Sequence, residues 1–231
     1  MKGTSLLAVL LTAVGVGLVG ATPSPGETGS AGPPDVRVSL TTVTTVTSSA
    51  GTVYLTFDDG PHPTWTPKML AVLRKYGVRA VFFEIGQNVA TYPSVTRSLR
   101  TYGNLIGNHT WSHPDLTLLS NTGVTSQLNR MESALGYRPR CVRPPYGATN
   151  SRISTIIADR GQRQILWTVD PRDWSRPGTW TIVDRVLANV GPGSRILLHD
   201  GGGDRSQTVA AVDLLIPKLR ARGYVVGLMA C

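Results

Sequence analysis

Short apolar runs alternate along the chain with segments whose apolar residues recur every three or four positions. The short runs are rich in β-branched and aromatic residues, which is typical of buried strands. They predict strands at 53–57, 80–84, 105–107, 141–142, 164–168, 194–198 and 224–228. The periodic segments predict helices at 66–76, 92–102, 124–135, 151–160, 179–190 and 208–222. Because strands and helices alternate, the pattern predicts a single distorted (β/α) barrel of about seven parallel strands.

The first residues differ from this alternation. Lys2 precedes an apolar run at 6–19, and the small residues Gly20 and Ala21 follow. A charged start, an apolar run and a small-residue cleavage site are typical of a secretory signal peptide, here residues 1–21. The alternative is a permanent anchor, but the run is shorter than the ~20 residues that span a bilayer. We therefore expect a secreted, extracellular protein without stable membrane insertion after cleavage.

Residues 22–50 are rich in Pro, Gly, Ser and Thr and poor in large side chains. Such a composition buries too little apolar surface to order itself, so we expect a linker. A Thr/Val-rich stretch at 36–46 could instead pair as an edge strand. The remaining residues, 51–231, have the length of one catalytic domain.

Cysteine usage depends on the compartment. The chain has two cysteines, Cys141 and Cys231. In an oxidising environment they can form a disulfide, and the alternative is two free buried thiols.

Composition narrows the class of protein. Hydrophobic residues make up 41% and charged residues 16%, with 25 Gly and 16 Pro, which excludes a long charged coiled coil.

The net charge of +9 comes from 23 Lys and Arg against 14 Asp and Glu. The arginines are spread out, without a basic helix, so we expect no nucleic-acid partner. A polyanionic cell-wall neighbourhood or a solubility surface explains the charge equally well. We expect a monomer.

With so few acids, adjacent carboxylates stand out. Asp58 and Asp59 follow the strand at 53–57 and precede Gly60 and Pro61. Neighbouring carboxylates repel one another, so the pair needs a cation or a division of roles. Asp59 as a metal ligand and Asp58 as a base is one such division. The alternative is a plain turn with solvated acids.

Two of the four histidines lie close together. His109 and His113 belong to the segment HTWSH, and this spacing would place both rings on one face of a helical turn. The alternative is one core and one surface histidine. With Asp59 they form a two-histidine, one-carboxylate set. That set suits catalytic zinc and also the iron of non-haem oxygenases, and spacing alone does not separate the two.

Three further polar clusters also follow predicted strands. Arg143 begins RPPYG, Asp170 and Asp173 belong to DPRDW, and His199 precedes Asp200 in LLHDG. A histidine beside an acid at the end of a strand can act as a general acid. Each cluster taken singly also fits an ordinary turn or ion pair.

Together the five clusters resemble one family. In order they match the five motifs of the polysaccharide deacetylases, the NodB-homology group or carbohydrate esterase family four. The matching segments are TFDDGP (56–61), HTWSHP (109–114), RPPYG (143–147), DPRDW (170–174) and LLHDG (197–201). The resemblance covers about residues 52–231 and implies the distorted (β/α) barrel of that family.

The resemblance also implies a metal site. Asp59, His109 and His113 would hold one divalent metal ion, usually zinc, although some relatives prefer cobalt. A bound metal would supply a nucleophile by lowering the pKa of its water to about 7.

Roles for the remaining motif residues follow from the same resemblance. Asp58 would be the general base and Arg143 would orient it. His199 would be the general acid, tuned by Asp173. Three residues would complete the acetyl pocket: the backbone N–H of Tyr146 for the oxyanion, and the side chains of Trp174 and Leu197 for the methyl group.

The predicted function is therefore removal of acetyl groups from N-acetylglucosamine residues of chitin oligomers or peptidoglycan. An acetylxylan esterase would use the same site on O-acetyl groups, and the motifs do not separate the two. A catalytically silent carbohydrate-binding relative is the third hypothesis, and the complete set of motif residues argues against it.

Overall fold

The computed structural model describes residues 50–231. The predicted signal peptide and all but the last residue of the predicted linker, including the candidate edge strand at 36–46, lie outside the described residues. The predictions about secretion and the linker are therefore not tested by the fold. Within the described part, no helix has the length and apolar character needed to cross a bilayer.

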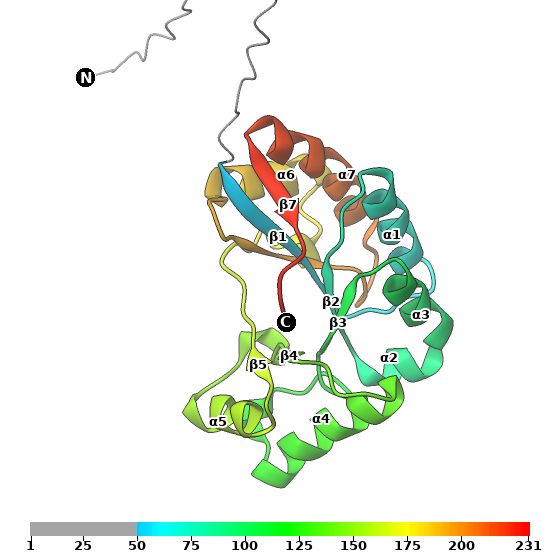
Figure 1. Ribbon diagram of the computed structural model, residues 1–231, viewed down its shortest axis with the longest axis vertical. Helices are drawn as coiled ribbons and strands as arrows, with labels where there is room; N and C mark the ends of the chain where they lie inside the picture. Colours follow the sequence, from blue (N-terminus) through cyan, green and yellow to red (C-terminus); the bar gives the residue numbers. More distant parts are fainter. Residues whose placement is uncertain (1–49) are drawn as a thin grey trace, which may run out of the picture. The chain divides into compact units, whose positions relative to one another are not determined.

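Parallel strands form one curved sheet, and helices pack against its outer side (Figure 1). The strands are β1 (Gly51–Asp58), β2 (Val81–Glu84), β3 (Leu105–Asn108), β4 (Cys141–Val142), β5 (Arg163–Gln164), β6 (Arg195–His199) and β7 (Tyr224–Gly227). Their order is β5-β4-β3-β2-β1-β6, and β7 pairs with the first half of β1. Every pairing is parallel, which confirms the predicted α/β architecture.

One predicted strand was wrong in its length. The run predicted at 164–168 forms only the short β5, because the two ends of this segment pair with different partners. Ile165 donates its N–H to Val142 of β4, whereas Val169 bridges Ile196 of β6. The segment therefore crosses from one end of the sheet to the other. It closes the sheet into a distorted barrel instead of lying along a single neighbour.

The helices agree closely with the predicted segments. They are α1 (Trp65–Lys75), α2 (Gly86–Thr91), α3 (Pro93–Thr101), α4 (Asn121–Leu135), α5 (Ser151–Asp159), α6 (Thr179–Asn189) and α7 (Ser206–Ala221). Side-chain caps explain where two of them begin. Ser120 accepts the N–H of Gly123 before α4, and Asn150 accepts the N–H of Ile153 before α5. Helix α2 is absent from the predicted helices, because six residues are too few to show helical periodicity.

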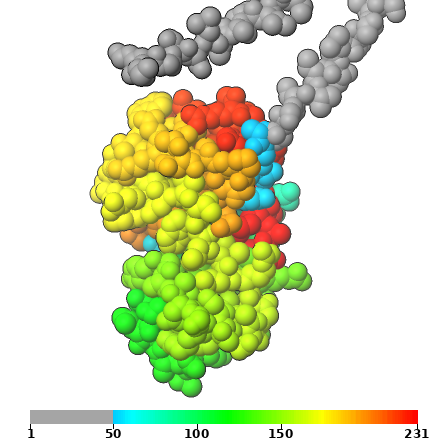
Figure 2. Space-filling model, turned by 90° about the vertical axis from the view of Figure 1, so that its left-hand side faces the viewer, coloured from blue at the N-terminus to red at the C-terminus, as the bar shows by residue number. Residues whose placement is uncertain are grey.

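The main core lies between the sheet and helices α1, α6 and α7. A smaller cluster fills the inside of the curved sheet, where Phe83 and Ile165 pack against Met229 of the C-terminal segment. A disulfide between Cys141 and Cys231 ties this segment to β4, with the two Cα atoms 5.2 Å apart. On the face shown in Figure 2, green residues that include α4 form one end, and gold and red residues that include α6 and α7 form the other.

Candidate metal centre and active site

The polar motif residues meet at the carboxyl ends of the strands, around a cavity of about 420 Å³. Parallel strands place their carboxyl ends on one side of the sheet, which explains why motifs far apart in sequence converge. The cavity is lined by Asp58, Asp59, His109, His113, Tyr146, Trp167, Asp170, Trp174, Leu197 and His199. Arg143 and Asp173 lie behind this lining, where both are buried.

The acidic pair lies where β1 ends. Asp58 is the last residue of β1 and is only 3% exposed, so it is not the solvated turn residue of the alternative reading. Asp59 follows with a φ of 72°, a left-handed conformation that is uncommon outside glycine. The Asn88 side chain donates a 2.9 Å hydrogen bond to the carbonyl oxygen of Asp59. This hydrogen bond holds the backbone of Asp59 in its left-handed conformation.

The two histidines do not lie on a helical turn, so that part of the prediction was wrong. His109 directly follows β3, and the segment then turns through Thr110 and His113, whose φ angles are 68° and 60°. The Thr110 hydroxyl accepts the N–H of His113 at 3.0 Å and holds the turn. An irregular loop thus brings together the same two rings that the spacing assigned to a helix face.

Asp59, His109 and His113 fit a divalent metal ion. Asp59 Oδ1 lies 3.6 Å from His109 Nε2 and 3.3 Å from His113 Nε2. The ligand atoms of all three residues lie within 4.8 Å of one another. Asp59 Oδ1 is buried and has no hydrogen-bond partner among the described residues. A buried carboxylate oxygen without a donor is costly, and a cation at this point would satisfy it.

The protonation state of His109 also suits a ligand. Burial lowers the pKa of His109 to about 3, so its ring is neutral at physiological pH. Its Nδ1 lies 2.7 Å from the carbonyl oxygen of Arg143. In the neutral ring this nitrogen carries the proton and donates it to that carbonyl. The lone pair of Nε2 then faces Asp59 and His113, as metal-binding histidines require.

Asp58 and Arg143 form a buried ion pair beside these ligands. Arg143 Nη1 donates to Asp58 Oδ1 at 2.6 Å and to the Thr56 hydroxyl at 3.0 Å. Burial raises the pKa of Asp58, and the charge of Arg143 opposes this shift. A carboxylate with a raised pKa is a better proton acceptor than an ordinary aspartate, so the arrangement suits a general base.

His199 lies on the same cavity, at the end of β6. Its Nδ1 is 2.7 Å from Asp173 Oδ1, and its backbone N–H donates to Asp173 Oδ2 at 2.9 Å. Burial alone would lower the pKa of His199. The hydrogen bond and charge of Asp173, with Asp58 and Asp59 nearby, instead raise it to about 9. His199 is therefore protonated at neutral pH and can donate a proton.

The pocket residues assigned by resemblance also reach the cavity. Tyr146 has a φ of 61° and places its ring against His113, with ring centroids 4.6 Å apart. Trp174 is half-exposed, whereas Leu197 is buried at the cavity wall. Sequence reasoning gave no role to Trp167 or Asp170, which line the same cavity. Trp167 lies within the strand-like segment 165–169 and Asp170 directly follows it, and that position was the signal that could have identified them.

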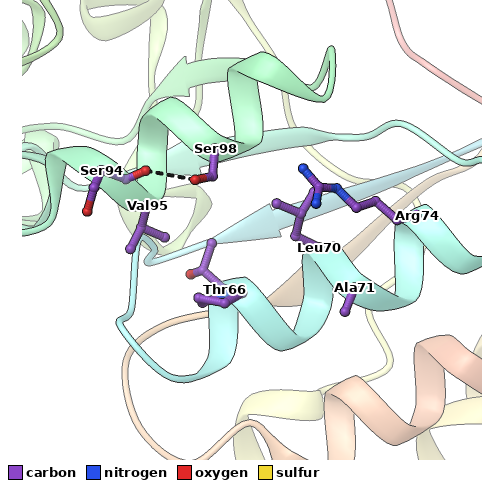
Figure 3. A pocket seen from close by; sticks show the side chains of 8 residues that line it. Thr66, Leu70, Ala71, Arg74, Ser94, Val95 and Ser98 are labelled. Atoms are coloured by element: carbon purple, nitrogen blue, oxygen red, sulfur yellow. Dashed lines mark hydrogen bonds between the residues drawn. The ribbon is translucent and has the colours of Figure 1, made fainter.

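A second hollow lies between α1 and α3 and has a volume of about 340 Å³ (Figure 3). Its lining includes Thr66, Leu70, Val95 and Ser98, and Arg74 is the one charged side chain in it. It offers neither an acid–base pair nor a set of metal ligands. This hollow therefore offers no alternative catalytic site.

Comparison with known proteins identifies the family. The family model described as "Polysaccharide deacetylase" matches residues 45–165. The chain belongs to the polysaccharide deacetylase family. A chitooligosaccharide deacetylase of Sinorhizobium fredii is 42% identical over 204 residues, which cover 81% of this chain and 94% of that protein. A peptidoglycan-N-acetylglucosamine deacetylase of Bacillus cereus is 38% identical, covering 74% of this chain and 83% of the relative.

Solved structures of polysaccharide deacetylases share the fold. The Bc1960 peptidoglycan N-acetylglucosamine deacetylase has a TM-score of 0.75 at 35% identity, covering 78% of this chain and 86% of its own. A family 4 carbohydrate esterase from Streptomyces lividans, solved with acetate, has a TM-score of 0.73 at 35% identity. The alignment covers 79% of this chain and 95% of that structure. The resemblance seen in the five motifs is thus confirmed for both family and fold.

One neighbour shows that the fold alone does not establish activity. A CE4 family pseudoenzyme from Bacillus anthracis has a TM-score of 0.71 at 30% identity, covering 77% of this chain and 63% of its own. The argument for catalysis in this chain therefore rests on its side chains and their geometry.

Proposed function

We propose that this polysaccharide deacetylase is a secreted, metal-dependent hydrolase that removes acetyl groups from N-acetylglucosamine residues of chitin oligomers or peptidoglycan. One observation carries the proposal. The Asp59–His109–His113 set lies on the same cavity as an ion-paired aspartate, Asp58, and a protonated histidine, His199. Amide hydrolysis at neutral pH needs a nucleophile, a base and an acid, and the cavity has a candidate for each.

Asp59, His109 and His113 would hold the divalent ion, which we propose is zinc, with cobalt as an alternative. When bound, such an ion supplies the nucleophile by lowering the pKa of a water molecule to about 7. Hydrogen bonds from neighbouring residues hold two of the three proposed ligands in position. The carbonyl of Arg143 orients the His109 ring, and Asn88 holds the backbone of Asp59.

Asp58 acts as the base. Its Oδ1 is occupied by Arg143, so Oδ2 is the oxygen that takes the proton from the attacking water. Asp58 Oδ2 lies 3.7 Å from His109 Nε2, which places the accepting oxygen beside the proposed metal position. Arg143 keeps the carboxylate ionised before the transfer and fixed in direction while the proton moves.

His199 acts as the acid on the leaving group. An amine is a poor leaving group unless it is protonated, so the C–N bond breaks as the nitrogen accepts a proton. The raised pKa of His199 keeps that proton in place at neutral pH, and its Nε2 is the donor because Nδ1 is bound to Asp173. The products are acetate and a free amine on the sugar.

The remaining pocket residues bind the acetyl group. The backbone N–H of Tyr146 would donate to the oxyanion as the carbonyl is attacked. Trp174 and Leu197 offer apolar surface for the methyl group at the same cavity.

The substrate proposal rests on the relatives, which include chitooligosaccharide and peptidoglycan deacetylases. An acetylxylan esterase would use the same catalytic groups, and no observation in this chain favours it. Purified protein should therefore be assayed for acetate release from chitopentaose, peptidoglycan and acetylated xylan in parallel. Release from the two N-acetylated substrates supports the proposal. Release from acetylated xylan alone would contradict it.

A further inference from the structure

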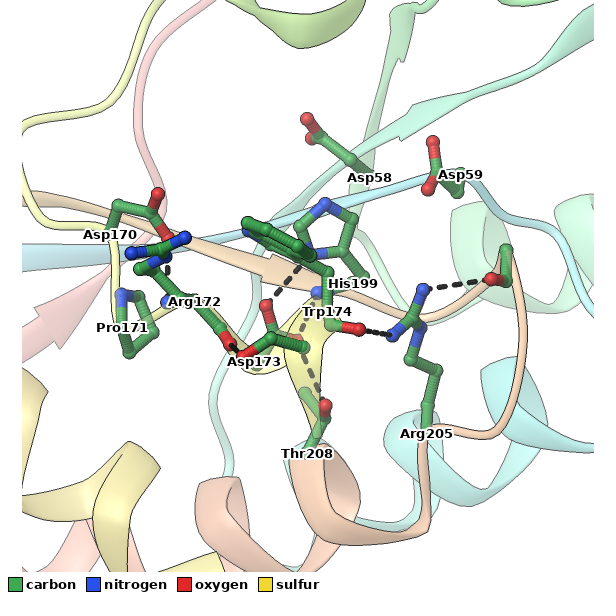
Figure 4. Close-up of polar contacts among 12 residues, drawn as sticks. Asp58, Asp59, Asp170, Pro171, Arg172, Asp173, Trp174, His199, Arg205 and Thr208 are labelled. Carbon is green, nitrogen blue, oxygen red and sulfur yellow. Dashed lines mark hydrogen bonds and ion pairs between the residues drawn. The ribbon is translucent and has the colours of Figure 1, made fainter. Parts of the chain in front are cut away.

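The segment that begins α7 contacts the turn that carries Asp173 and Trp174 (Figure 4). Four of the five residues at 204–208 bond to residues 173–178. Asp204 pairs with Arg176 at 2.9 Å, and Gln207 accepts the N–H of Gly178 at 2.7 Å. We call residues 204–208 the brace and residues 173–178 the catalytic turn.

The other two contacts of the brace reach Asp173 and Trp174 directly. Thr208, which is 1% exposed, donates its hydroxyl proton to Asp173 Oδ2 at 2.8 Å. Arg205 Nη1 lies 3.4 Å from the carbonyl oxygen of Trp174. The residue that tunes the acid and the residue that lines the pocket are thus both held from α7.

Arg205 is the centre of the brace. It is only 4% exposed, and its guanidinium also donates to the carbonyl oxygens of Gly201 at 2.6 Å and Gly202 at 2.9 Å. Among the described residues, no carboxylate lies within ion-pair distance of it. A buried cation bonded only to carbonyl oxygens fixes backbone in place, and the fork of its donors suits several carbonyls at once.

The catalytic turn needs such support because its backbone is strained. Arg172 and Arg176, which flank Asp173 and Trp174, have φ angles of 55° and 54°. Residues other than glycine rarely adopt this left-handed conformation, and they keep it only where the surroundings impose it.

Arg205 also lies close to the proposed metal ligand. A Cβ atom at Gly202 would be 2.7 Å from Asp59 Oδ2 and 3.2 Å from Arg205 Nη2. The absence of a side chain at Gly202 therefore lets the loop after His199 fit between the two groups. Arg205 bonds to this loop through the carbonyls of Gly201 and Gly202, and to the catalytic turn through the carbonyl of Trp174. It therefore joins the loop to the turn.

We propose that the brace positions the acid side of the site, and that Arg205 is its central positioning residue. The catalytic part of this inference rests on the proposed function, whereas the effect on Trp174 does not. Without the brace, the strained turn relaxes, so Trp174 and the Asp173–His199 pair lose their fixed positions. A displacement of about 1 Å can lower a rate by as much as 10²-fold.

Arg205→Lys tests the proposal, because lysine keeps the charge but cannot bond to three carbonyls through a planar fork. The chain has five tryptophans, so 5-fluorotryptophan labelling gives five ¹⁹F signals, and Trp174→Phe identifies one of them. We expect the Trp174 signal to shift or broaden in Arg205→Lys while the other four stay in place. We also expect kcat to fall about 10- to 100-fold, with a smaller change in KM.

The matched control is Arg220→Lys, the same change on the same helix, where the arginine is exposed and donates to the Tyr76 carbonyl. It should leave the Trp174 signal and kcat unchanged. If Arg205→Lys does not fold, Gln207→Met replaces it, since it removes only the acceptor for Gly178. An unchanged Trp174 signal in the folded variant would overturn the inference. If the wild-type protein releases no acetate, the proposed function fails, and the ¹⁹F spectra alone decide this inference.

Discussion

Arg143 donates a 2.6 Å hydrogen bond to one carboxylate oxygen of Asp58 and leaves the other oxygen facing the cavity. Arg143 is fully buried, and its Nε is bound to the carbonyl oxygen of Ile165 at 3.1 Å. The arginine therefore cannot follow Asp58 if the carboxylate rotates. This fixed pair gives the site a base with one oxygen held and one oxygen available.

Asp58→Asn separates proton transfer from metal binding. Asparagine has the same shape but cannot accept the proton, so turnover should fall by about 10²- to 10⁴-fold. Zinc content should stay close to that of the wild-type protein, because Asp58 is not in the ligand set. Acetate release and elemental analysis measure the two quantities. Asp213→Asn, which alters an exposed pair with Lys75, is the control and should have no effect. A near-normal rate in Asp58→Asn would remove this residue as the base.

His109→Ala should abolish both zinc binding and activity, because it removes one of three ligands. Isothermal titration with zinc measures the binding without reference to turnover. His62→Ala is the matched control, since this histidine lies outside the site and accepts the backbone N–H groups of Thr64 and Trp65. That variant should bind zinc normally. Full zinc affinity in His109→Ala would show that the ligand set is wrong.

The pKa of His199 should depend on Asp173. In metal-free protein, NMR titration should give a pKa of about 9 for His199. Asp173→Asn removes the negative charge bonded to Nδ1, so the pKa of His199 should fall well below its value in the wild-type protein, with Asp58 and Asp59 still raising it. Because the folded-state pKa is raised, the contribution of this pair to stability is complete below pH 6.5 and is lost as the pH rises through about 9. A pKa that does not move in Asp173→Asn would show that the pair is not coupled.

The alkaline limit of activity should follow the same group. The proton on His199 is needed for the leaving amine, so kcat should fall as the pH rises through the pKa of this residue. In Asp173→Asn the fall should begin at lower pH. In the wild-type protein, a bound divalent cation near His199 also lowers the pKa of this residue. The alkaline limit of the zinc-loaded protein should therefore lie below the pKa of about 9 expected for His199 in the metal-free protein. An alkaline limit that is identical in the wild-type protein and in Asp173→Asn would contradict the role of His199.

The Cys141–Cys231 disulfide should stabilise the fold substantially. It closes a loop of 90 residues, and loops of this length are worth about 4.6 kcal/mol in the chain-entropy estimate. Cys231→Ser should lower the free energy of unfolding in urea by a similar amount, and reduction of the wild-type protein should have the same effect. Alkylation of both cysteines without a reductant would show that the bond does not form.

Sequence reasoning predicted that the motif residues converge, because parallel strands bring their carboxyl ends together. Asp58, His109, Arg143 and His199 each follow a run of apolar residues that predicts a strand, and this placement alone indicates that they converge. The same reasoning gave nearly all helices, since their apolar periodicity is strong. The tertiary contacts did not need to be known for either prediction.

The errors arose where backbone conformation depends on distant contacts. The His109–His113 spacing fits a helix, but the Thr110 hydroxyl and two left-handed residues shape a loop instead. The segment 165–169 carries strand-forming residues, yet it divides its pairing between β4 and β6. Arg205 belongs to none of the five motifs, so only its contacts identify it.

The most direct test of the central claim is acetate release from chitopentaose before and after removal of the metal. Protein stripped with a chelator and dialysed should release no acetate, and stoichiometric zinc should restore the rate. His109→Ala, treated in the same way, should stay inactive after zinc is added. Undiminished acetate release from fully stripped protein would contradict the account, because Asp58 and His199 would then work without the ion that Asp59, His109 and His113 are proposed to hold.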